Sequence, residues 1–358
     1  MILIWNAGSS SLKAKLYDVK AKRLVLIKSA SVARIGESET KNHANASLQI
    51  INEEKLEGYD IKTVAYRVVH SGGELKDGAE ASDKIIKQLK VVSSLAPLHN
   101  PPAIENIEVS KKVFLKQRHK LFFDTSFFKD LPAEAITYPL PLEIADREKI
   151  KKFGFHGISH AYALEESGAK SRDRVISIHL GAGCSVCAIV NKKPLDTSMG
   201  LTPSGGLIMQ SRTGDIDPGI VFYLIRKLGA EKTEKIINNE SGLAGLTGTS
   251  GNMYDVLYLA GQKIEDSNYL PSLSLKKDET STADALLALK MYTNSIKRYI
   301  GGYATLMQGV DMVIFTGKIG AGSSVIRDMV MEGLEFLKIK RVVKVEPDEE
   351  KAIARFLI

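Results

Sequence analysis

Two segments of this chain repeat one local pattern: a buried strand, a turn of small residues and a second strand. Residues 2–6 are apolar except for Asn6, residues 7–11 are small, and residues 12–18 largely alternate between apolar and polar side chains. The same order recurs at 175–190 around the glycine turn 181–183. Such runs predict strands joined by a hairpin, whose exposed N–H groups can cradle a phosphate. The repetition predicts a duplicated domain.

A third glycine-rich element lies further along the chain. Residues 312–316 predict a strand, residues 317–324 a glycine loop, and the run from Val325 a helix. Such an element suits a nucleotide base or ribose, or an anion at a helix N-terminus. The remaining sequence alternates strand and helix patterns, which predicts mixed α/β domains.

A long helix is predicted before this element. Its apolar residues recur at helical spacing, which indicates a core or dimer contact and not a site. The polar stretch 262–282 in front of it predicts a loop or an exposed helix start. The apolar residues are Ala285, Leu289, Tyr292, Ile296, Ile300, Tyr303 and Met307.

Length and charge narrow the class of protein. The 358 residues exceed one ordinary core and predict about two domains. The net charge of +7, from 49 basic and 42 acidic residues, is spread along the chain without a basic run. An anionic small substrate accounts for this charge, so we expect no nucleic-acid partner. No apolar run reaches the ~18 residues of a membrane helix, and no signal-peptide pattern opens the chain, so we expect a cytoplasmic protein.

Cys184 and Cys187 form a C-x-x-C pattern inside an apolar run. A zinc ribbon would need a second pair, and side chains three apart on a strand point to opposite faces. We interpret the two cysteines as small buried apolar residues.

Several separated motifs carry more specific information. They are N-A-G-S-S-S-L-K at 6–13, Y-R-V-V-H at 66–70 followed after Ser71 by G-G-E at 72–74, A-P-L-H-N-P-P at 96–102, F-D-T-S-F at 123–127, G-F-H-G at 154–157 with S-H at 159–160, D-T-S-M-G at 196–200 with T-P at 202–203, S-R-T-G-D-I-D-P at 211–218, and E-E at 349–350 with I-A at 353–354. Together, and in this order, they resemble the acetate kinase family over nearly the whole chain, with Ser71 as an insertion.

The resemblance implies a duplicated actin-like (ribonuclease H-like) α/β kinase fold with two domains and a central cleft. Residues 1–148 would form the acyl-substrate domain, completed by 350–358, and residues 149–349 the nucleotide and dimerisation domain. The implied reaction is reversible, direct in-line phosphoryl transfer between ATP and acetate. The implied cofactor is Mg²⁺, or Mn²⁺ in its place, and the implied assembly is a homodimer.

The reaction joins two anions, so positioned cations and a metal are its main needs. A guanidinium can hold a carboxylate or a phosphate bidentately. The resemblance assigns Arg67 to the substrate carboxylate and Arg212 to the carboxylate and the transferring phosphoryl group. His156 would donate to that phosphoryl group. Asp124 would orient an arginine or the metal shell, since a carboxylate acceptor needs no base; alternatively it makes strand-end turn hydrogen bonds.

Further positions match the family's binding residues. Asn6 and Glu349 would hold the metal, largely through water. Lys13 would lie near the donor phosphates, or face solvent on its alternating strand. His99 and His179 would support the substrates. The small acyl pocket would comprise Val69, Leu98, His99, Phe155 and Pro203. The nucleotide site would comprise Lys13, His179, Leu180, Gly181, Ala182, Gly183, Asn252, Met253, Tyr254, Lys318, Ile319, Gly320, Ala321 and Gly322.

The departures from the family pattern cluster on the donor side. Ala182 replaces an asparagine, residues 250–255 lack an acid and an arginine, and Lys318 stands where a glycine lies beside the adenine. Ala321 and Gly322 replace a Glu-Asn pair. A remodelled donor site that takes pyrophosphate or another donor is therefore an alternative to ATP. The chain is also shorter than typical members, which bears on domain closure.

Two alternatives concern the acceptor and the class. Because a methylene group changes affinity by only ~1 kcal/mol, propionate or butyrate is an alternative acceptor. A non-catalytic ligand-binding sensor is the alternative of another class, although a sensor would not need transition-state groups as well as ligand contacts.

Overall fold

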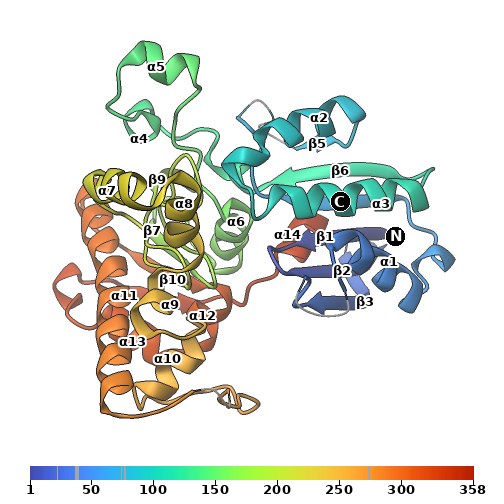
Figure 1. Cartoon of the computed structure of the whole chain (residues 1–358). Helices are drawn as coiled ribbons and strands as arrows, with labels where there is room; N and C mark the ends of the chain where they lie inside the picture. The colour runs from blue at the N-terminus through green and yellow to red at the C-terminus, as the bar shows by residue number, and fades with distance from the viewer. Residues whose placement is uncertain (22, 37–39, 74, 76–77, 273–274) are drawn as a thin grey trace. The chain divides into compact units, whose positions relative to one another are not determined.

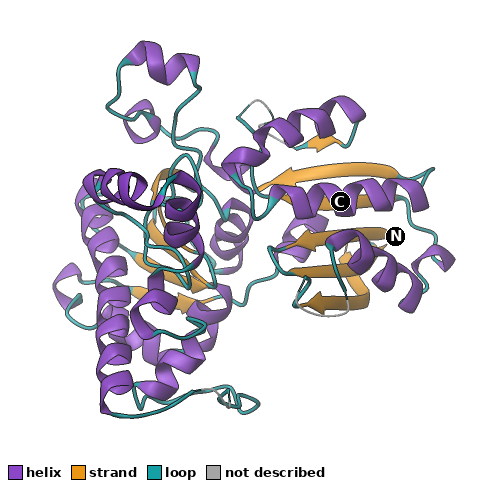
Figure 2. Cartoon of the chain, in the orientation of Figure 1, coloured by secondary structure: helices purple, strands orange, loops and turns teal. Residues whose placement is uncertain are grey.

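The chain divides into two compact units in a computed structural model that describes all residues except 22, 37–39, 74, 76–77 and 273–274 (Figure 1). Unit 1 contains Met1–Lys129, Phe155–Tyr162 and Asp348–Ile358. Unit 2 contains Asp130–Gly154 and Ala163–Pro347. Each unit combines a sheet with helices (Figure 2).

Unit 1 contains a six-stranded sheet in the order β3-β2-β1-β4-β6-β5. β1 pairs antiparallel with β2 and parallel with β4, β2 pairs antiparallel with β3, and β4 pairs parallel with β6. The predicted first hairpin is therefore present. The strands are β1 Ile2–Ala7, β2 Ser11–Lys20, β3 Arg23–Ala33, β4 Thr63–Val68, β5 Ala79–Glu80 and β6 Arg118–Phe123.

The helices of unit 1 pack against this sheet. α1 and α3 contact its strands β1, β2 and β4, and α14 contacts β1, β2, β3 and β4. The elements are α1 His43–Glu53, α2 Asp83–Val92, α3 Asn100–Val113 and α14 Glu349–Arg355, with the 3₁₀ turns η1 Leu56–Gly58, η2 Ser93–Leu95 and η3 Asp124–Phe128. α6, Gly157–Glu166, begins in unit 1 and ends in unit 2.

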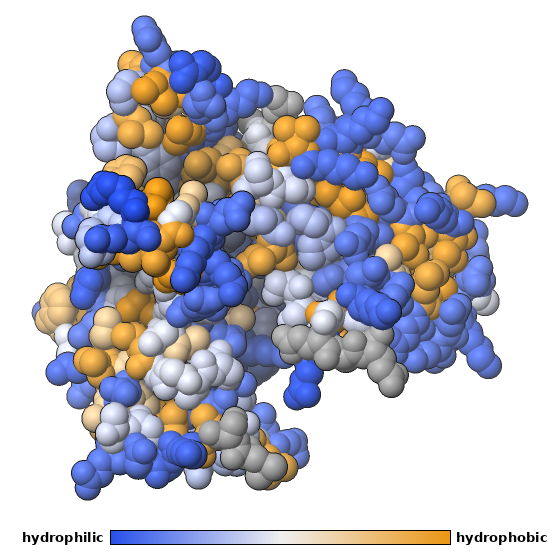
Figure 3. All heavy atoms as spheres, viewed as in Figure 1, coloured by the Kyte–Doolittle hydropathy of each residue, from blue (hydrophilic) through white to orange (hydrophobic). Residues whose placement is uncertain are grey.

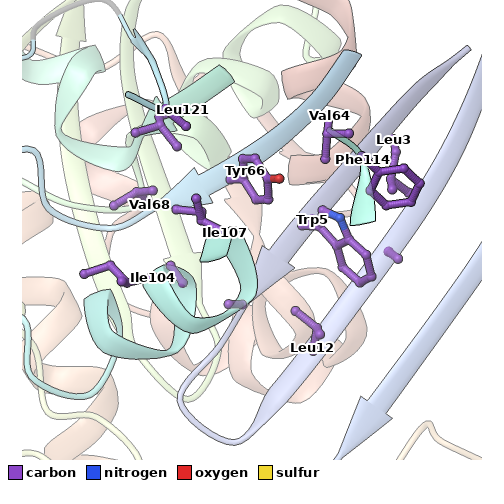
Figure 4. Packing of buried hydrophobic residues seen from close by; sticks show 14 of the residues in the cluster. Leu3, Trp5, Leu12, Val64, Tyr66, Val68, Ile104, Ile107, Phe114 and Leu121 are labelled. Carbon is purple, nitrogen blue, oxygen red and sulfur yellow. The ribbon is translucent and has the colours of Figure 1, made fainter. Parts of the chain in front are cut away.

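Period-two alternation gives the unit 1 sheet two different faces. On one face, Trp5, Leu12 and Tyr66 join a buried cluster completed by residues of α1 and α3 (Figure 4). Trp5, the only tryptophan of the chain, is 1% exposed. The intervening residues of the same strands point to the other face. The buried cluster thus occupies one face. The other face, which α14 contacts, carries polar side chains together with buried apolar residues such as Ile4 and Ala65.

Unit 2 repeats the same strand topology. Its sheet has the order β9-β8-β7-β10-β11, with antiparallel β9/β8/β7 and parallel β7/β10/β11. This matches the antiparallel β3/β2/β1 and parallel β1/β4/β6 of unit 1, so the duplication predicted from the sequence is present. The strands are β7 Arg174–Leu180, β8 Cys184–Val190, β9 Lys193–Thr197, β10 Met312–Thr316 and β11 Arg341–Lys344.

The long helix α11 supplies much of the core of unit 2. Asp278 caps it with a capping box to Ser281, and its predicted apolar stripe is buried within this chain. The stripe is therefore core. The helices of unit 2 are α4 Ala133–Ile136, α5 Leu142–Arg147, α7 Pro218–Leu228, α8 Ala230–Asn239, α9 Gly242–Thr247, α10 Met253–Leu259, α11 Glu279–Leu306, α12 Gly317–Gly322 and α13 Ser324–Met331, with the 3₁₀ turn η4 Glu335–Leu337.

Two local expectations meet different outcomes. Cys184 and Cys187 lie on β8, fully buried and unpaired, as predicted. The glycine stretch 317–324 was predicted as a loop, and this is wrong, because α12 and the start of α13 occupy it. Gly317, at φ +79°, turns β10 directly into α12, and the Arg327 guanidinium donates to two carbonyls at the C-terminal end of that helix. None of the helices in the described ranges has the length and apolar character needed to cross a membrane.

Candidate active site

Three polar side chains stand in one row across the unit 1 sheet. The strand register places Lys13 of β2 opposite Asn6 of β1, and Asn6 opposite Arg67 of β4. Residues directly opposite each other share a face of the sheet, so all three side chains lie on the face away from the hydrophobic core. Among the described residues, Lys13 has no ion pair or hydrogen bond.

Asp124 and Asn6 hold the Arg67 guanidinium on two sides. Nε and Nη2 of Arg67 donate to the two carboxylate oxygens of Asp124, at 3.0 and 2.7 Å. Nη1 donates to Oδ1 of Asn6, at 3.1 Å. A guanidinium has five N–H groups, and these bonds use three. One N–H on each terminal nitrogen is left over, a pair that suits a carboxylate.

Burial and charge set the electrostatics of this pair. Burial lowers the pKa of Arg67, but the carboxylates of Asp124, Glu349 and Glu350 together outweigh it and raise the pKa above its usual value. Burial raises the pKa of the Asp124 carboxyl, while the Arg67 guanidinium opposes the rise. The bidentate geometry is that of an ionised pair. Asp124 is thus paired with Arg67, as the prediction that it orients an arginine requires.

The turn that carries His156 packs directly against Asp124. His156 has a left-handed backbone, φ +58°, and its backbone N–H donates to the Asp124 carboxylate. A side chain at Gly157 would collide with the Asp124 backbone oxygen and approach the Phe127 Cβ to 2.7 Å. A non-glycine residue with positive φ costs about 1–3 kcal/mol and is common at functional sites. The fold therefore places His156 beside the Arg67–Asp124 pair at an energetic cost.

The predicted acyl-pocket residues of unit 1 lie on neighbouring segments. Val69 directly follows β4 and is 5% exposed, and Phe155 is 1% exposed. Leu98 and His99 immediately precede α3, with His99 at its N-cap. The Phe155 ring meets the His70 ring edge-on, with centroids 5.4 Å apart. This ring contact connects the segment after β4, which carries Val69, to the segment that carries Phe155.

The inserted residue, Ser71, is tied to the same region. Its hydroxyl accepts a hydrogen bond from Thr125 Oγ1 at 2.8 Å, and Thr125 directly follows Asp124. It also accepts from the backbone N–H of Gly73 at 3.2 Å. Ser71 is therefore hydrogen-bonded to the segments that surround Asp124 and Gly73. Glu74, the last residue of that motif, lies outside the described residues.

Asn6 and Glu349, the predicted metal ligands, both belong to unit 1. Glu349 is 8% exposed in the first turn of α14 and has no hydrogen-bond or ion-pair partner among the described residues. Asn6 Oδ1 accepts one hydrogen bond, from Arg67, and keeps a lone pair. A search of the described residues finds no cluster of three His, Cys, Asp or Glu side chains. Two oxygen donors supplemented by water fit Mg²⁺, which retains water in most protein sites.

Unit 2 contains the second arginine of the motifs, and among the described residues this arginine has no acidic partner. Arg212 Nη1 donates to the backbone oxygen of Pro203 at 2.9 Å and approaches Met209 Sδ at 3.6 Å. Within the described part of the chain it forms no ion pair. Burial lowers the pKa of the Arg212 guanidinium, yet arginine keeps its charge in proteins. A half-buried cation without a carboxylate suits a bound anion.

The loop that carries Arg212 is tightly braced. Tyr299 donates to Asp215 Oδ2 at 2.6 Å, and the Gly206 N–H donates to Asp215 Oδ1 at 2.7 Å. A Cβ on Gly242, where φ is +61°, would lie 2.6 Å from the Arg212 backbone oxygen. These contacts connect both ends of the Pro203–Arg212 segment to the body of unit 2.

Three segments predicted to bind nucleotide occur in unit 2, and two of them meet. The turn 181–183 closes with Gly181 N–H donating to the Gly183 oxygen at 3.0 Å. A side chain at Gly317 would collide with the Leu180 backbone, and a Cβ on Gly320 would lie 3.6 Å from Leu180 Cβ. β7 and α12 thus pack closely through glycine. His179 lies opposite Thr316 at the ends of the parallel strands β7 and β10.

The third segment begins α10. Asn252 caps this helix through its side chain, which accepts from the Tyr254 N–H at 3.0 Å. Met253 is 3% exposed and belongs to the core. A Cβ on Gly322 would lie 3.4 Å from the Tyr254 hydroxyl, which brings α10 and α12 together. Lys318, in contrast, is exposed on α12 and has no ion pair among the described residues.

The structure adds two residues, Glu350 and Lys15, to which the motifs assigned no role. Glu350 Oε1 accepts a hydrogen bond from Asn6 Nδ2 at 2.6 Å. Lys15 Nζ lies 3.3 Å from Glu350 Oε2 and 2.8 Å from Asp348 Oδ1. The alternation of β2 had placed Lys15 on the polar face, but only the return of α14 to unit 1 reveals its partners.

A duplicated α/β fold with the same strand order in both halves, and with glycine-rich turns between its strands, is the fold of the actin-like class of kinases. The comparisons with known proteins narrow this class.

The family model of the acetokinase family matches residues 32–354. The acetate kinase of Coprothermobacter proteolyticus is 38% identical, over 95% of this chain and 88% of that protein. The crystal structure of Porphyromonas gingivalis acetate kinase superimposes with a TM-score of 0.81 at 29% identity, covering 99% of this chain and 97% of that one. The crystal structure of a propionate kinase from Francisella tularensis superimposes with a TM-score of 0.83 at 27% identity, covering 99% of this chain and 98% of that one.

This chain belongs to the acetokinase family. The predicted family, the duplicated actin-like kinase fold and the enzyme class are confirmed. Acetate kinase activity is the function that these relatives support.

Proposed function

We propose that this chain catalyses reversible phosphoryl transfer between a phosphoryl donor and acetate, giving acetyl phosphate. The observation that carries the proposal is the Arg67 guanidinium, fixed by Asp124 and Asn6 with one N–H left on each terminal nitrogen. A small carboxylate fits this pair of donors. Three hydrogen bonds already hold the guanidinium, so binding requires little reordering of the arginine.

The roles of the remaining groups follow from charge. The acetate oxygen attacks the transferring phosphorus directly, because a carboxylate near pH 7 needs no base. Negative charge spreads over the equatorial oxygens of the phosphoryl group in the transition state. Arg212, a cation without an acidic partner among the described residues, and His156 would stabilise that charge. Asp124 orients Arg67 and does not touch the substrate.

Magnesium is the proposed cofactor, with manganese as a substitute. Asn6 Oδ1 and the Glu349 carboxylate would hold it, largely through water. When bound, the ion neutralises the charge of the donor phosphates. Lys13, which stands beside Asn6 on the sheet, would add a further positive charge near those phosphates.

ATP is the proposed donor. His179–Leu180, the turn 181–183, Asn252–Tyr254 and residues 318–322 are the proposed nucleotide contacts; the contribution of Met253 would come from its backbone, because its side chain is buried in the core. One observation favours a second donor: Lys318 is an exposed cation without an acidic partner in the described residues. An ammonium group in place of a family glycine suits a phosphate at least as well as a base, so pyrophosphate is the second candidate.

Acetate is the proposed acceptor, with propionate and butyrate as alternatives. Val69, Leu98, Phe155 and Pro203 would line a pocket for a methyl or ethyl group, with His99 beside it. Each further methylene changes affinity by only ~1 kcal/mol, so the pocket is expected to discriminate weakly. The similarity to a propionate kinase structure is consistent with such overlap.

A homodimer in the cytoplasm is the proposed state of the protein, without nucleic-acid partners. α7 supports the proposal of a dimer. None of its residues is buried, and five large apolar or aromatic side chains are exposed on it: Ile220, Phe222, Tyr223, Ile225 and Leu228. Apolar residues are visible on the displayed surface among hydrophilic ones (Figure 3). Sedimentation of the wild type and of Phe222→Asp tests this assembly: the wild type should sediment as a dimer and the variant as a monomer.

The experiment that tests the proposed function is an acyl phosphate assay with hydroxylamine trapping. Acetate, propionate and butyrate are each offered with ATP, GTP or pyrophosphate in the presence of Mg²⁺. Acetyl hydroxamate formed with ATP supports the main proposal. Product formed only with pyrophosphate assigns the second donor, and no product with any pair contradicts enzymatic function and favours the sensor.

A further inference from the structure

A chain of hydrogen bonds and ion pairs connects the substrate-facing arginine to the start of α14. Arg67 donates to Asn6 Oδ1 at 3.1 Å, and Asn6 Nδ2 donates to Glu350 Oε1 at 2.6 Å. Lys15 then pairs with Glu350 Oε2 at 3.3 Å and with Asp348 Oδ1 at 2.8 Å. The Glu350 side chain is 3% exposed, so its charge needs this partner.

Asn6 is the joint of this chain, because its amide has two distinct ends. The orientation seen here turns the oxygen toward the Arg67 donor and the NH₂ group toward the Glu350 acceptor. Flipping the amide would set two donors against each other at Arg67 and two acceptors against each other at Glu350. Glu350 therefore fixes the direction of Asn6, which in turn holds the Nη1 side of Arg67.

Lys15 holds Glu350 in place. Asp348 Oδ1 also accepts from the Lys351 N–H at 2.8 Å, as the N-cap of α14. By bonding to both Asp348 and Glu350, Lys15 fastens the first turn of α14 to β2. Its side chain is 19% exposed, which screens this pair less than a surface ion pair.

We propose that Lys15 is a positioning residue for carboxylate binding: through Glu350 and Asn6 it fixes the orientation of the Arg67 guanidinium. The inference rests on the proposed function, because it assumes that Arg67 holds the acceptor. Lys15 itself touches no substrate in this account. Replacing Lys15 should therefore change the KM of the acceptor, and this change should depend on the presence of Arg67.

The test compares Lys15→Met, which removes the charge at similar length, with Lys15→Arg, which keeps it. At saturating Mg²⁺, which keeps the proposed Asn6 and Glu349 metal site filled, Lys15→Met should raise the acetate KM about tenfold and leave the donor KM within about twofold, because Arg67 then acts on acceptor binding alone. Lys15→Arg should recover most of the loss. Lys28→Met is the matched control, since Lys28 pairs with Glu54 at 3.0 Å and lies on β3 opposite Leu16, which puts it on the other face of the sheet from Lys15. This variant should leave both constants unchanged.

Two further measurements separate positioning from simple destabilisation. In an Arg67→Ala background, Lys15→Met should change acetate kcat/KM by less than about twofold, because the residue it acts through is gone. Urea unfolding followed by Trp5 fluorescence reports the integrity of unit 1 for every variant. Equal losses for acetate and donor, or a full tenfold effect in the Arg67→Ala background, would overturn the proposal.

A readout without turnover keeps this test independent of the proposed function. The ¹⁵N-bound protons of Arg67 Nη1, which donates to Asn6, are assigned by their loss in Arg67→Ala. They should be protected from exchange in the wild type and in Lys15→Arg, and exposed to exchange in Lys15→Met. An unchanged resonance in Lys15→Met contradicts the positioning role even if the enzyme is active. A wild type that makes no acyl phosphate but shows the predicted resonances contradicts the proposed function alone.

Discussion

Arg67, on β4, donates to both carboxylate oxygens of Asp124, at 3.0 and 2.7 Å, although Asp124 follows the neighbouring strand β6 and lies 57 positions further along the chain. The pair exists because β4 and β6 end at the same edge of the sheet, where Asp124 directly follows β6. Alternation on β4 turns Arg67 away from the hydrophobic core that holds Tyr66 and Val68. The order of the strands and the alternation of side chains thus place the Arg67 guanidinium next to the Asp124 carboxylate.

Asp124→Asn should reduce acetate kcat/KM by about 100-fold, because the amide offers one acceptor oxygen where Arg67 now has two, and the guanidinium loses its fixed orientation. Steady-state kinetics at varied acetate concentration measures the effect. Asp83→Asn is the control, since Asp83 forms a 2.9 Å pair with Lys111 but is 90% exposed. If Asp124→Asn retains wild-type kcat/KM, Asp124 has no part in orienting Arg67.

Gly157→Ala should destabilise unit 1 by about 1–3 kcal/mol, because the added methyl group has no room between Asp124 and Phe127. Urea unfolding monitored by Trp5 fluorescence measures the free energy of unfolding of this unit. Gly58→Ala serves as the comparison, because its Cβ would meet nothing within 4 Å. Equal stability of the two variants would show that the His156 turn can move away from Asp124.

Arg212→Lys should lower kcat by about 100- to 1,000-fold. A lysine has a single ammonium group, so it cannot both donate to the Pro203 oxygen and present a planar pair of donors to a phosphoryl group. Pre-steady-state measurement of acetyl phosphate formation separates this loss from product release. Arg172→Lys, at an exposed position, is the matched exchange and should be silent. A fully active Arg212→Lys enzyme would remove Arg212 from the transition-state account.

His119 predicts a loss of stability in weak acid. His119 Nε2–H donates to the Phe114 backbone oxygen at 2.8 Å, and Nδ1 accepts from the Tyr66 hydroxyl at 2.7 Å. Burial lowers the pKa of His119 below the ordinary 6.5. Just below pH 6.5 this histidine is protonated in the unfolded chain but still neutral in the folded chain. The free energy of unfolding therefore falls as pH falls through this range. Trp5-monitored urea unfolding between pH 7.5 and 5.5 measures this, with His119→Gln expected to show a weaker pH dependence.

The hairpins and their repetition could be predicted because their signals are local. Leu12, Ala14 and Leu16 alternate with lysines on β2, and glycine marks each turn, so periodicity alone indicates strands. The family motifs then indicated which polar residues belong to the chemistry. Arg67 and Asp124 could be paired in this way only through the resemblance, since their contact depends on strand order.

The remaining features depend on tertiary contacts that no local pattern carries. The glycine stretch 317–324 reads as a loop, yet packing of Gly317 and Gly320 against Leu180 permits a helix there. Lys15 reads as a solvent-facing lysine until α14, more than 300 residues later, brings Asp348 and Glu350 beside it. Long-range partners of this kind are accessible only from the folded chain.

The central claim is that the guanidinium of Arg67 binds the acceptor carboxylate. The most direct measurement is acetate kcat/KM for the wild type and for Arg67→Ala, without and with millimolar guanidinium chloride, with urea and sodium chloride as controls. The account predicts a loss of about 100-fold or more in Arg67→Ala and partial recovery with guanidinium alone, because the missing cation is restored to its site. An Arg67→Ala enzyme with an unchanged acetate kcat/KM would contradict the account.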